Sequence, residues 1–408
     1  MEKLKVGIIG GGASGFFAAI EAAKNGAEVL IFEKTNKVLS KVLVSGGGRC
    51  NVTNGTGSPS EFLKGYPRGK NFMKKVFKTF NSKDTFKWFE SRGVPLKTEE
   101  DGRVFPVSNS SSSIIEALKK AAEINGVKVL YKTGIQEVRR LDGKFLLNSG
   151  KEDIYVDKLV ICTGGKPKKE GYTLIEQLGH TIHPPIPSLF TFNAPSSKII
   201  QLKGLSVPNG HIRFEGSQLQ YSGPILITHW GISGPAVLKL SAFGAEWLHD
   251  KEYKAVALVK WREEFTEEGL RADLLGFKCD HPLKIVYKNP LFALPGRLWE
   301  FLVDKAEINS DIKWGDMNKK KINKLIENLL RFSLKVSGKT TFKEEFVTAG
   351  GVSLNEIDAN TMESKLVKGL FFAGEVINVD GITGGYNFQA AWSTGFLAGS
   401  RSSGIVIQ

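Results

Sequence analysis

The sequence has few cysteines and no segment long enough to span a membrane. Its three cysteines, Cys50, Cys162 and Cys279, lie far apart and form no C-x-x-C or C-x4-C pair, which argues against a disulfide framework and against a redox dithiol. The histidines form no H-x-x-x-H pattern and no cluster with cysteine, so we expect no metal site. Because a predicted strand begins at residue 5, there is no room for a signal peptide, and we expect a cytoplasmic protein without a membrane contact.

An excess of acidic residues is also lacking. The 408 residues, enough for two or three domains, include 56 Lys and Arg against 42 Asp and Glu, a net charge of +14. Such a charge steers anionic ligands or holds nucleic acid. No basic motif is interleaved with aromatic residues, however, so we favour a soluble basic surface over a nucleic-acid partner.

Residues 5–34 predict a strand, a glycine-rich turn, a helix and a second strand. An apolar run stops at three glycines, a helical pattern begins at Ala13, and Gly10, Gly12 and Gly15 form a G-x-G-x-x-G motif. In this motif the first glycine permits the tight turn, the second lets the backbone approach a pyrophosphate, and the third lets helix and strand pack closely. The segment therefore predicts a dinucleotide site at the positive end of a helix.

An acidic residue follows in the expected place. The helix should end at Asn25-Gly26, and the strand 27–32 then delivers Glu33 at its carboxyl end. A carboxylate there accepts from ribose hydroxyls and repels a 2′-phosphate. This favours the adenosine of FAD or NAD over that of NADP.

A second glycine-rich stretch lies in residues 39–57. Gly46–Gly48 leave room for backbone N–H groups to approach a flat or anionic ligand. We expect a loop that runs along the pyrophosphate toward the reactive ring, with Lys41 and Arg49 as charge partners; the alternative is a surface turn. Cys50 has no histidine neighbour, which indicates a packing residue rather than a nucleophile.

The next part of the chain continues the nucleotide-binding pattern. Residues 71–93 and 108–126 predict helices, and the turn-like segment 101–106 lies between them. The apolar strand 157–163, ending at Gly164-Gly165, should lie close to the first strand. No second G-x-G-x-x-G follows it, so the chain lacks a dedicated NAD(P)H domain.

From about residue 189 the pattern changes. Short alternating runs predict a β-rich inserted domain of barrel type over 189–261 plus about 331–345, and 262–330 reads as a helical cap domain broken by prolines. The FAD-binding domain would then consist of residues 1–188 and 346–408. Within the insertion, His229 precedes a glycine-rich turn; it could be an acid or base near the cofactor, but a structural histidine at a strand end is favoured.

The closing segment is the second strong signal. A strand over 369–374 ends at Glu375, whose carboxylate could contact the ribityl chain, and a glycine-rich turn leads into a helix that begins near Tyr386 or Asn387. Such a helix would aim its N–H groups at a ring carbonyl and stabilise the anionic reduced flavin. A plain strand–helix unit is the alternative.

With these segments together, the chain resembles the BaiN-like NAD(P)/FAD-dependent flavoproteins, which include aminoacetone oxidases and 3-dehydro-bile-acid reductases. The resemblance covers nearly the full length. It rests on GIIGGGASG at 7–15, SGGGRCNVTN at 45–54, GRVFP at 102–106, THWGISGP at 228–235 and FAGEVINVDGITGGYNFQAA at 372–391.

The resemblance implies an α/β fold: a Rossmann-type FAD-binding domain of the glutathione-reductase type, an inserted β-barrel-like domain and a helical domain over the flavin. It also implies that Ile135 meets the adenine through its backbone. The residues that we expect to bind FAD are Gly10, Gly12, Ala13, Ser14, Gly15, Glu33, Lys34, Lys41, Ser45, Gly46, Gly47, Gly48, Arg49, Cys50, Asn51, Ile135, Thr163, Gly164, Gly165, Gly374, Glu375, Gly384, Gly385, Tyr386, Asn387 and Gln389.

The leading hypothesis is an FAD-dependent oxidoreductase that transfers hydride between a small-molecule substrate and flavin, with NAD(P)H, bound transiently, or oxygen as the other redox partner. Candidate catalytic residues are Arg103, His229, Tyr386 and Asn387, none with an assigned role; Arg103 could equally pair with a structural carboxylate. The charge of +14 motivates one alternative, a flavin-dependent RNA-modifying enzyme. A non-catalytic flavin-binding redox sensor is the other, and no motif specifies an oligomeric state.

Overall fold

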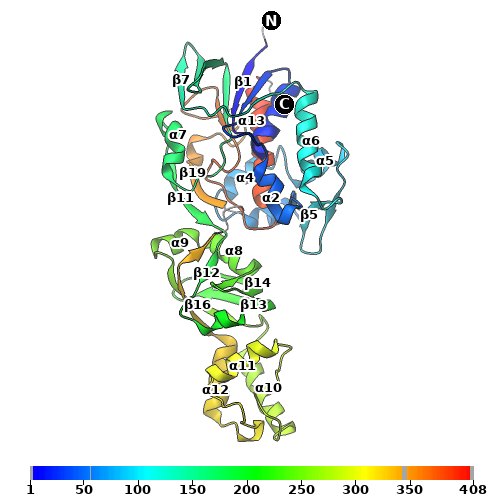
Figure 1. Cartoon of the computed structure of the whole chain (residues 1–408), viewed down its shortest axis with the longest axis vertical. Helices are drawn as coiled ribbons and strands as arrows, with labels where there is room; N and C mark the ends of the chain where they lie inside the picture. The colour runs from blue at the N-terminus through cyan, green and yellow to red at the C-terminus, as the bar shows by residue number, and fades with distance from the viewer. Residues whose placement is uncertain (1–2, 56, 342–346, 405–408) are drawn as a thin grey trace. The chain divides into compact units, whose positions relative to one another are not determined.

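The computed structural model describes residues 3–55, 57–341 and 347–404. These residues divide into two compact units (Figure 1). Unit 1 contains the described residues up to Ser188 together with those from Val347 onward, and unit 2 comprises Leu189–Thr341. Of the predicted domains and loops, residues 1–2, 56, 342–346 and 405–408 lie outside the described residues.

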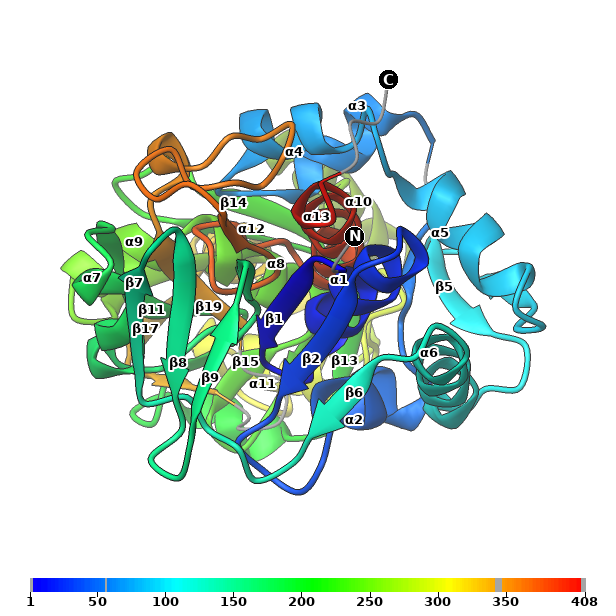
Figure 2. The same cartoon turned by 90° about the horizontal axis from the view of Figure 1, so that it is seen from above.

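Unit 1 is built on a parallel sheet of five strands. Each pairing in it is parallel, in the order β20-β10-β1-β2-β6, and Figure 2 shows β1, β2 and β6 side by side. The apolar side chains are buried, as expected for a parallel sheet covered on both faces. The strands are β1 (Lys5–Ile9), β2 (Glu28–Phe32), β6 (Lys128–Leu130), β10 (Lys158–Ile161) and β20 (Leu370–Phe372).

This arrangement confirms the predicted α/β fold with its Rossmann-type domain. Strand β10, from the middle of the chain, lies directly beside β1, and β20 from the closing segment lies beside β10. Because the carboxyl ends of parallel strands share one edge, the glycine-rich turns that follow these three strands meet at the same edge of the sheet.

The described residues of unit 1 also form further helices and three small antiparallel sheets. The further helices are α3 (Pro59–Phe62), α4 (Lys70–Val76), α5 (Ser82–Glu90), α6 (Ser111–Ile124) and α7 (Thr173–Gln177). One small antiparallel sheet contains β3 (Thr53–Asn54), β5 (Arg103–Pro106) and β4 (Leu96–Thr98). A second contains β7 (Glu137–Leu141), β8 (Lys144–Asn148) and β9 (Asp153–Val156). The third pairs β11 (Ile182–Ser188) with β19 (Val347–Val352).

Two local predictions were wrong. Residues 39–57 are not one loop, because α2 (Ser40–Gly48) begins the segment. Its first residues are compatible with a helix and bury Val42, and the helical geometry is lost from residue 45 onward, where Gly46, Gly47 and Gly48 have positive φ. Residues 101–106 are not a turn throughout. The turn ends at Gly102, after which the buried side chains of β5 pair with β3 and β4.

Unit 2 is an antiparallel sheet with helices packed against it. The sheet order is β17-β16-β13-β14-β15-β12-β18. Its strands are β12 (Thr191–Asn193), β13 (Ser206–Phe214), β14 (Gln220–Ile227), β15 (Gly231–Ser233), β16 (Lys254–Lys260), β17 (Phe332–Ser337) and β18 (Lys339–Thr340). Its helices are α8 (Pro235–Phe243), α9 (Ala245–Asp250), α10 (Glu267–Asp280), α11 (Gly296–Lys305) and α12 (Lys319–Leu330).

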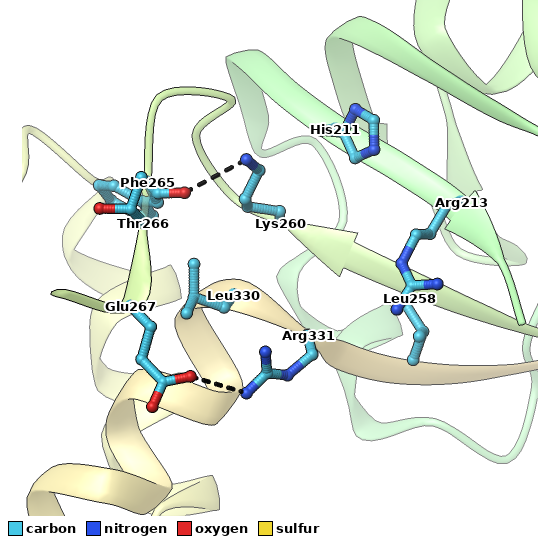
Figure 3. Close-up of a pocket in the computed structure, with 9 residues that line it drawn as sticks. All are labelled: His211, Arg213, Leu258, Lys260, Phe265, Thr266, Glu267, Leu330 and Arg331. Carbon is cyan, nitrogen blue, oxygen red and sulfur yellow. Dashed lines mark hydrogen bonds and ion pairs between the residues drawn. The ribbon is translucent and has the colours of Figure 1, made fainter. Parts of the chain in front are cut away.

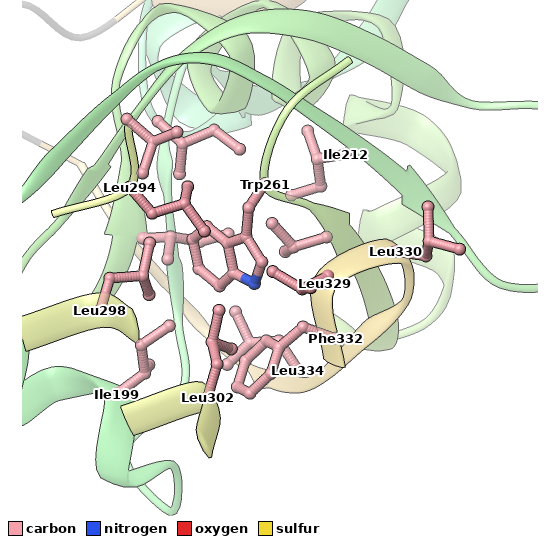
Figure 4. Close-up of a cluster of buried hydrophobic side chains, with 14 of the residues drawn as sticks. Ile199, Ile212, Trp261, Leu294, Leu298, Leu302, Leu329, Leu330, Phe332 and Leu334 are labelled. Atoms are coloured by element: carbon pink, nitrogen blue, oxygen red, sulfur yellow. The ribbon is translucent and has the colours of Figure 1, made fainter. Parts of the chain in front are cut away.

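The sheet and the helices of unit 2 share one hydrophobic core. Trp261 is fully buried in it, and its Nε1 donates to the Asn328 carbonyl oxygen at 3.1 Å. Around the indole lie Ile212 and Phe332 from the sheet and Leu298 and other leucines from the helices (Figure 4). The segments that we predicted as a β-rich and a helical domain therefore bury their apolar side chains together. In the part of the chain that the structure describes, no helix is both long and apolar enough to cross a membrane.

Helices α1 (Ala13–Lys24) and α13 (Tyr386–Ser402) pack closely through small residues in unit 1. A Cβ placed on Gly399 would lie 2.2 Å from the Ala18 carbonyl oxygen of α1. A Cβ placed on Gly395 would lie 2.6 Å from the Ser14 carbonyl oxygen of α1. The crossing therefore requires glycine on α13, and it ties the end of the chain to its beginning.

We expect Gly399→Ala to destabilise unit 1 by about 1–3 kcal/mol, because the added methyl group overpacks the crossing. The matched control is Gly276→Ala in the interior of α10, where a Cβ would meet no atom within 4 Å. That change should stabilise the protein by up to about 1 kcal/mol through helix propensity. Thermal unfolding of both variants checks the prediction, and a shift of Tm in the same direction for both would contradict it.

Candidate functional site

The turn after β1 is fixed by close backbone contacts at two of its glycines. Gly10 has φ +113°, and a Cβ there would lie 2.4 Å from the Cys162 carbonyl oxygen. A Cβ on Gly15 would lie 2.0 Å from the carbonyl oxygen of Gly10. Gly12 differs, since a Cβ there would meet no protein atom within 4 Å. The turn thus leaves open space at the position where the motif predicts a pyrophosphate.

The start of α1 faces this space without a competing side chain. Its N-cap is Gly12, which makes no side-chain capping bond, and the first turn contains no acidic residue. The first N–H groups of a helix have no intrahelical acceptor and carry the positive end of its dipole. This geometry fits a phosphate.

Glu33 lies at the end of β2, as predicted, and supports the turn. Its Oε2 accepts from the Gly11 N–H at 3.0 Å, and its Oε1 accepts from the N–H and the hydroxyl of Thr35, each at 2.8 Å. Each carboxylate oxygen retains further acceptor capacity. The side chain is therefore both a brace for the turn and an acceptor suited to ribose hydroxyls; Lys34 beside it is exposed.

Lys41 and Glu375, predicted as separate cofactor contacts, form an ion pair at 2.7 Å. Glu375 Oε1 also accepts from the Thr348 N–H at 2.9 Å. A Cβ on Gly165 would lie 2.8 Å from the same carboxylate oxygen. The pair therefore joins α2 to the strand ends of β10 and β20, and it places both charges beside the glycine turn that follows β10.

Lys166 is a site residue that the sequence analysis missed. Burial is the main cause that lowers the pKa of Lys166, and the nearby charges of Lys34 and Lys41 lower it further. A half-buried lysine among other lysines is stabilised by an anion, so this group fits the phosphates of a dinucleotide. Its position directly after Gly164-Gly165, at the end of β10, is the signal that could have identified it.

Two buried hydroxyl groups test whether the site fits FAD. Among the described residues, Thr163 Oγ1 and Thr348 Oγ1 have no hydrogen-bond partner. Buried polar groups are normally paired, so each requires a partner that the described protein atoms do not supply. Both lie next to the glycines or the carboxylate described above. Together with the open space at Gly12, they fit a polar, phosphate-containing cofactor.

Asn51 connects the second glycine-rich stretch to the start of α13. With its amide oriented to satisfy both ends, Nδ2 donates to the Thr53 carbonyl at 2.9 Å and Oδ1 accepts from the Gly385 N–H at 3.0 Å. Gly385 has φ +94°, and a Cβ there would lie 2.3 Å from the Thr53 carbonyl oxygen. The helix has no side-chain cap at Gly385, so the first N–H groups of α13 remain available to an acceptor.

Tyr386 and Asn387 hold this turn in place. The buried Tyr386 ring lies 4.6 Å from that of Phe62, and the Tyr386 carbonyl accepts from the Tyr66 hydroxyl at 2.8 Å. Burial raises the pKa of Tyr66 well above its usual value. Asn387 bonds through both amide atoms to the backbone of Gly381, at 2.8 and 2.9 Å. Both catalytic candidates on α13 are thus engaged in positioning contacts.

Arg49 and Arg103 share one carboxylate, that of Glu99. The distances are 2.7 Å for Arg49 and 3.1 Å for Arg103, which also pairs with Asp101 at 2.7 Å. The Arg49 guanidinium lies over the Phe105 ring at 3.8 Å. Arg103 therefore has the structural carboxylate partners that the sequence analysis considered as its alternative role.

The remaining predicted contacts lie along the same elements. Ser14 donates to the Ala373 carbonyl at 3.3 Å, and a Cβ on Gly374 would lie 2.3 Å from Ser14 Oγ. Buried Gln389 accepts from two threonine hydroxyls and donates to Ser393. Ser45 donates to the Val42 carbonyl, and Asn54 donates to the Gly384 carbonyl. Ile135 lies half-buried between β6 and β7. Positive φ angles occur at Gly46, Gly47, Gly48 and Gly164.

His229 belongs to unit 2, between β14 and β15. It is exposed, and its ring lies 4.2 Å from that of Trp230. No three His, Cys, Asp or Glu side chains come together as a metal site within the described ranges. The three cysteines are free, and burial raises the pKa of Cys50 and of Cys162 to about 12.

The family model of the HI0933-like protein Rossmann domain matches residues 4–401. The chain belongs to this family. It is 30% identical to a ribosomal RNA dihydrouridine synthase of Haemophilus influenzae, with 95% of this chain and 96% of that protein aligned. It is also 30% identical to a 3-dehydro-bile acid Δ(4,6)-reductase of Clostridium scindens, over 98% and 99% of the two chains. A ribosomal RNA dihydrouridine synthase of Escherichia coli is 31% identical, over 97% and 96%.

A solved structure shares the fold of this family member over its whole length. The 3-ketosteroid Δ1-dehydrogenase of Sterolibacterium denitrificans, in complex with 1,4-androstadiene-3,17-dione, has a TM-score of 0.52 at 11% identity and covers 99% of this chain and 100% of that one. The predicted resemblance to the flavoprotein family is confirmed. Family, reductase relative and site geometry assign the chain to the FAD-dependent oxidoreductases.

Two glycine substitutions separate a role in folding from a role in cofactor binding. Gly15→Ala should lower the stability of the FAD-free protein by about 1–3 kcal/mol, because the methyl group meets the Gly10 carbonyl. Gly12→Ala should leave that stability unchanged and weaken FAD binding by roughly tenfold or more, about 1.4 kcal/mol. Thermal unfolding without FAD and flavin titration distinguish the two, and unchanged FAD affinity in Gly12→Ala would contradict the site.

The thiol of Cys50 should be chemically inert. With a pKa of about 12, only roughly one molecule in ten thousand carries the thiolate at pH 8. We expect iodoacetamide to modify the exposed Cys279 in the native protein, and Cys50 and Cys162 only after unfolding. Mass spectrometry of the alkylated peptides reads this out. Rapid native labelling of Cys50 would contradict its assignment as a packing residue.

Proposed function

We propose that the chain is an FAD-dependent reductase that saturates a carbon–carbon double bond conjugated to a carbonyl group. This proposal rests on one observation: relatives aligned over nearly the whole chain act on very different substrates, and these substrates contain the same reacting group. A dihydrouridine synthase saturates the C5–C6 bond of uracil, next to a ring carbonyl, and a Δ(4,6)-reductase of 3-dehydro-bile acids saturates bonds conjugated to the C3 carbonyl. Both substrates contain this reacting group, whereas they differ in size and in charge.

Bound FAD supplies the two-electron chemistry. The residues described above would bind and orient it. The glycine turn and the start of α1 would hold the pyrophosphate, Glu33 the ribose, and the uncapped start of α13 the carbonyl edge of the ring. A helix N-terminus stabilises the negative charge that the ring acquires on reduction. Lys166 and the Lys41–Glu375 pair would complete the phosphate side.

Saturation of a conjugated bond also needs a proton at the carbon next to the carbonyl. Of the four predicted catalytic candidates, Arg103, Tyr386 and Asn387 are held in the structural contacts described above. The fourth candidate, His229, is exposed in unit 2. We propose NAD(P)H, bound without a dedicated domain, as the electron donor.

The test begins with anaerobic visible spectra of the purified protein. We expect a yellow protein whose flavin absorbance is bleached by NADPH or NADH. It should then recover on addition of a substrate with a conjugated double bond, such as a 4-en-3-one steroid or uridine-containing RNA. The matched controls are the saturated 3-oxo steroid and the same RNA with dihydrouridine. A protein that stays colourless after FAD reconstitution, or that only oxygen reoxidises, would contradict the proposal.

A further inference from the structure

The outward face of the unit 2 sheet carries cations on three neighbouring strands. Successive side chains of a strand point to opposite faces, so Ile212, Val259 and Phe332 enter the core. The outward positions between them belong to β13, β16 and β17, which are hydrogen-bonded in this order. They hold His211, Arg213, Lys254, Lys260 and Lys335, with Arg331 directly before β17; we call these six residues the basic face.

A cavity of about 310 Å³ opens on the basic face (Figure 3). His211 and Arg213 line it from β13, Lys260 from β16 and Arg331 from the start of β17, and Glu267 of α10 contributes the carboxylate. His211 lies opposite Lys260 in the register of the two strands. The cavity lining thus has three permanent cations and one carboxylate, which favours an anionic occupant.

The cations of the cavity differ in how far they are neutralised. Arg331 pairs with Glu327 at 2.7 Å and with Glu267 at 3.4 Å, so its charge is balanced within the protein. Lys260 Nζ donates to two backbone carbonyl oxygens, at 2.5 and 3.2 Å, and these do not cancel its charge. Arg213 forms no ion pair with any residue that the structure describes. Lys260 also interacts with the charge of the nearby Glu264, with which it forms no ion pair. Arg213 and, in part, Lys260 therefore leave positive charge for a ligand.

The charge of unit 2 is unevenly distributed along the sequence. In the segments that form the sheet, residues 189–262 and 331–341, Lys and Arg outnumber Asp and Glu by more than two to one. In the helical segment 263–330 the two are nearly equal. The positive charge of unit 2 is thus concentrated in the segments that contain its strands.

We propose that the basic face docks the phosphate backbone of RNA, with one phosphate held in the cavity between Arg213 and Lys260. This inference rests on the proposed function and names RNA as its substrate class. A single phosphate or mononucleotide would use the cavity alone. Beyond the cavity the basic face continues to Lys335, which forms no ion pair among the described residues, whereas Lys254 pairs with Glu252 at 2.8 Å. A chain of phosphates therefore engages Lys335 in addition to the cavity.

The experiment compares two double variants with equal loss of charge. Arg213→Gln with Lys335→Gln removes two exposed cations of the basic face that form no ion pair among the described residues. Lys119→Gln with Lys120→Gln removes two exposed lysines of α6 in unit 1. Fluorescence anisotropy measures the binding of a single-stranded, uridine-rich RNA oligonucleotide to the FAD-loaded proteins over a series of salt concentrations.

We expect the basic-face variant to bind RNA about fifteenfold more weakly at about 0.15 M salt, roughly fourfold for each lost phosphate contact. The slope of log affinity against log salt should fall by about 1.4, and the control variant should match the unchanged protein. No RNA binding by the unchanged protein at this salt, or an equal loss in both variants, would overturn the proposal. A raised KM for NADPH in the basic-face variant, with unchanged RNA binding, would also overturn it and assign the cavity to the cosubstrate phosphate.

A separate measurement keeps this inference distinct from the proposed function. Bleaching of the flavin by NAD(P)H and reoxidation by a 4-en-3-one steroid should be the same in the basic-face variant and in the unchanged protein, because neither residue belongs to the nucleotide site. If reoxidation by the steroid occurs without RNA binding, the reductase chemistry stands and RNA docking falls. If RNA binds but no conjugated substrate reoxidises the flavin, RNA docking stands and the reductase chemistry falls.

Discussion

The site depends on backbone atoms that approach one another without intervening side chains. At Gly10 the chain turns against the carbonyl of Cys162, and Gly15 brings α1 onto the carbonyl of Gly10. These two contacts set the direction in which α1 begins and hence the direction of its first N–H groups. Gly12, between them, is the position where the protein itself needs no glycine. Because folding does not require glycine at this position, a bound ligand can be the reason for it.

The same kind of constraint joins the two ends of the chain. Gly399 seats α13 on α1, and Gly385 lets the start of α13 pass against Thr53. Consequently the helix that should receive the flavin ring and the helix that should receive the pyrophosphate are parts of one packed body. A cofactor that spans both helix starts would link segments that are far apart in sequence, so binding it should stabilise unit 1 as a whole.

The sequence predicted best where the signal is local. The turn at Gly10, the position of Glu33 and the start of α13 at Tyr386 each follow from the residues that immediately surround them. Pairings across space could not be read in this way. The Lys41–Glu375 pair joins residues that are more than three hundred positions apart, and Lys166 becomes a site residue only because β10 ends beside the first turn. The early helix α2 was missed because its three glycines dominated the pattern of the segment.

The basic face illustrates why net charge alone was a weak guide to partners. Arg213, Lys260 and Arg331 are separated by long stretches of sequence, and each looks like an ordinary surface cation. Only the strand order brings them to one cavity, and only their ion pairs distinguish the balanced Arg331 from the two cations left available. Unit 1 carries the features that we propose to bind the cofactor. Substrate choice should therefore depend on surfaces such as this one, where a few charges can change without disturbing the glycine-based nucleotide site.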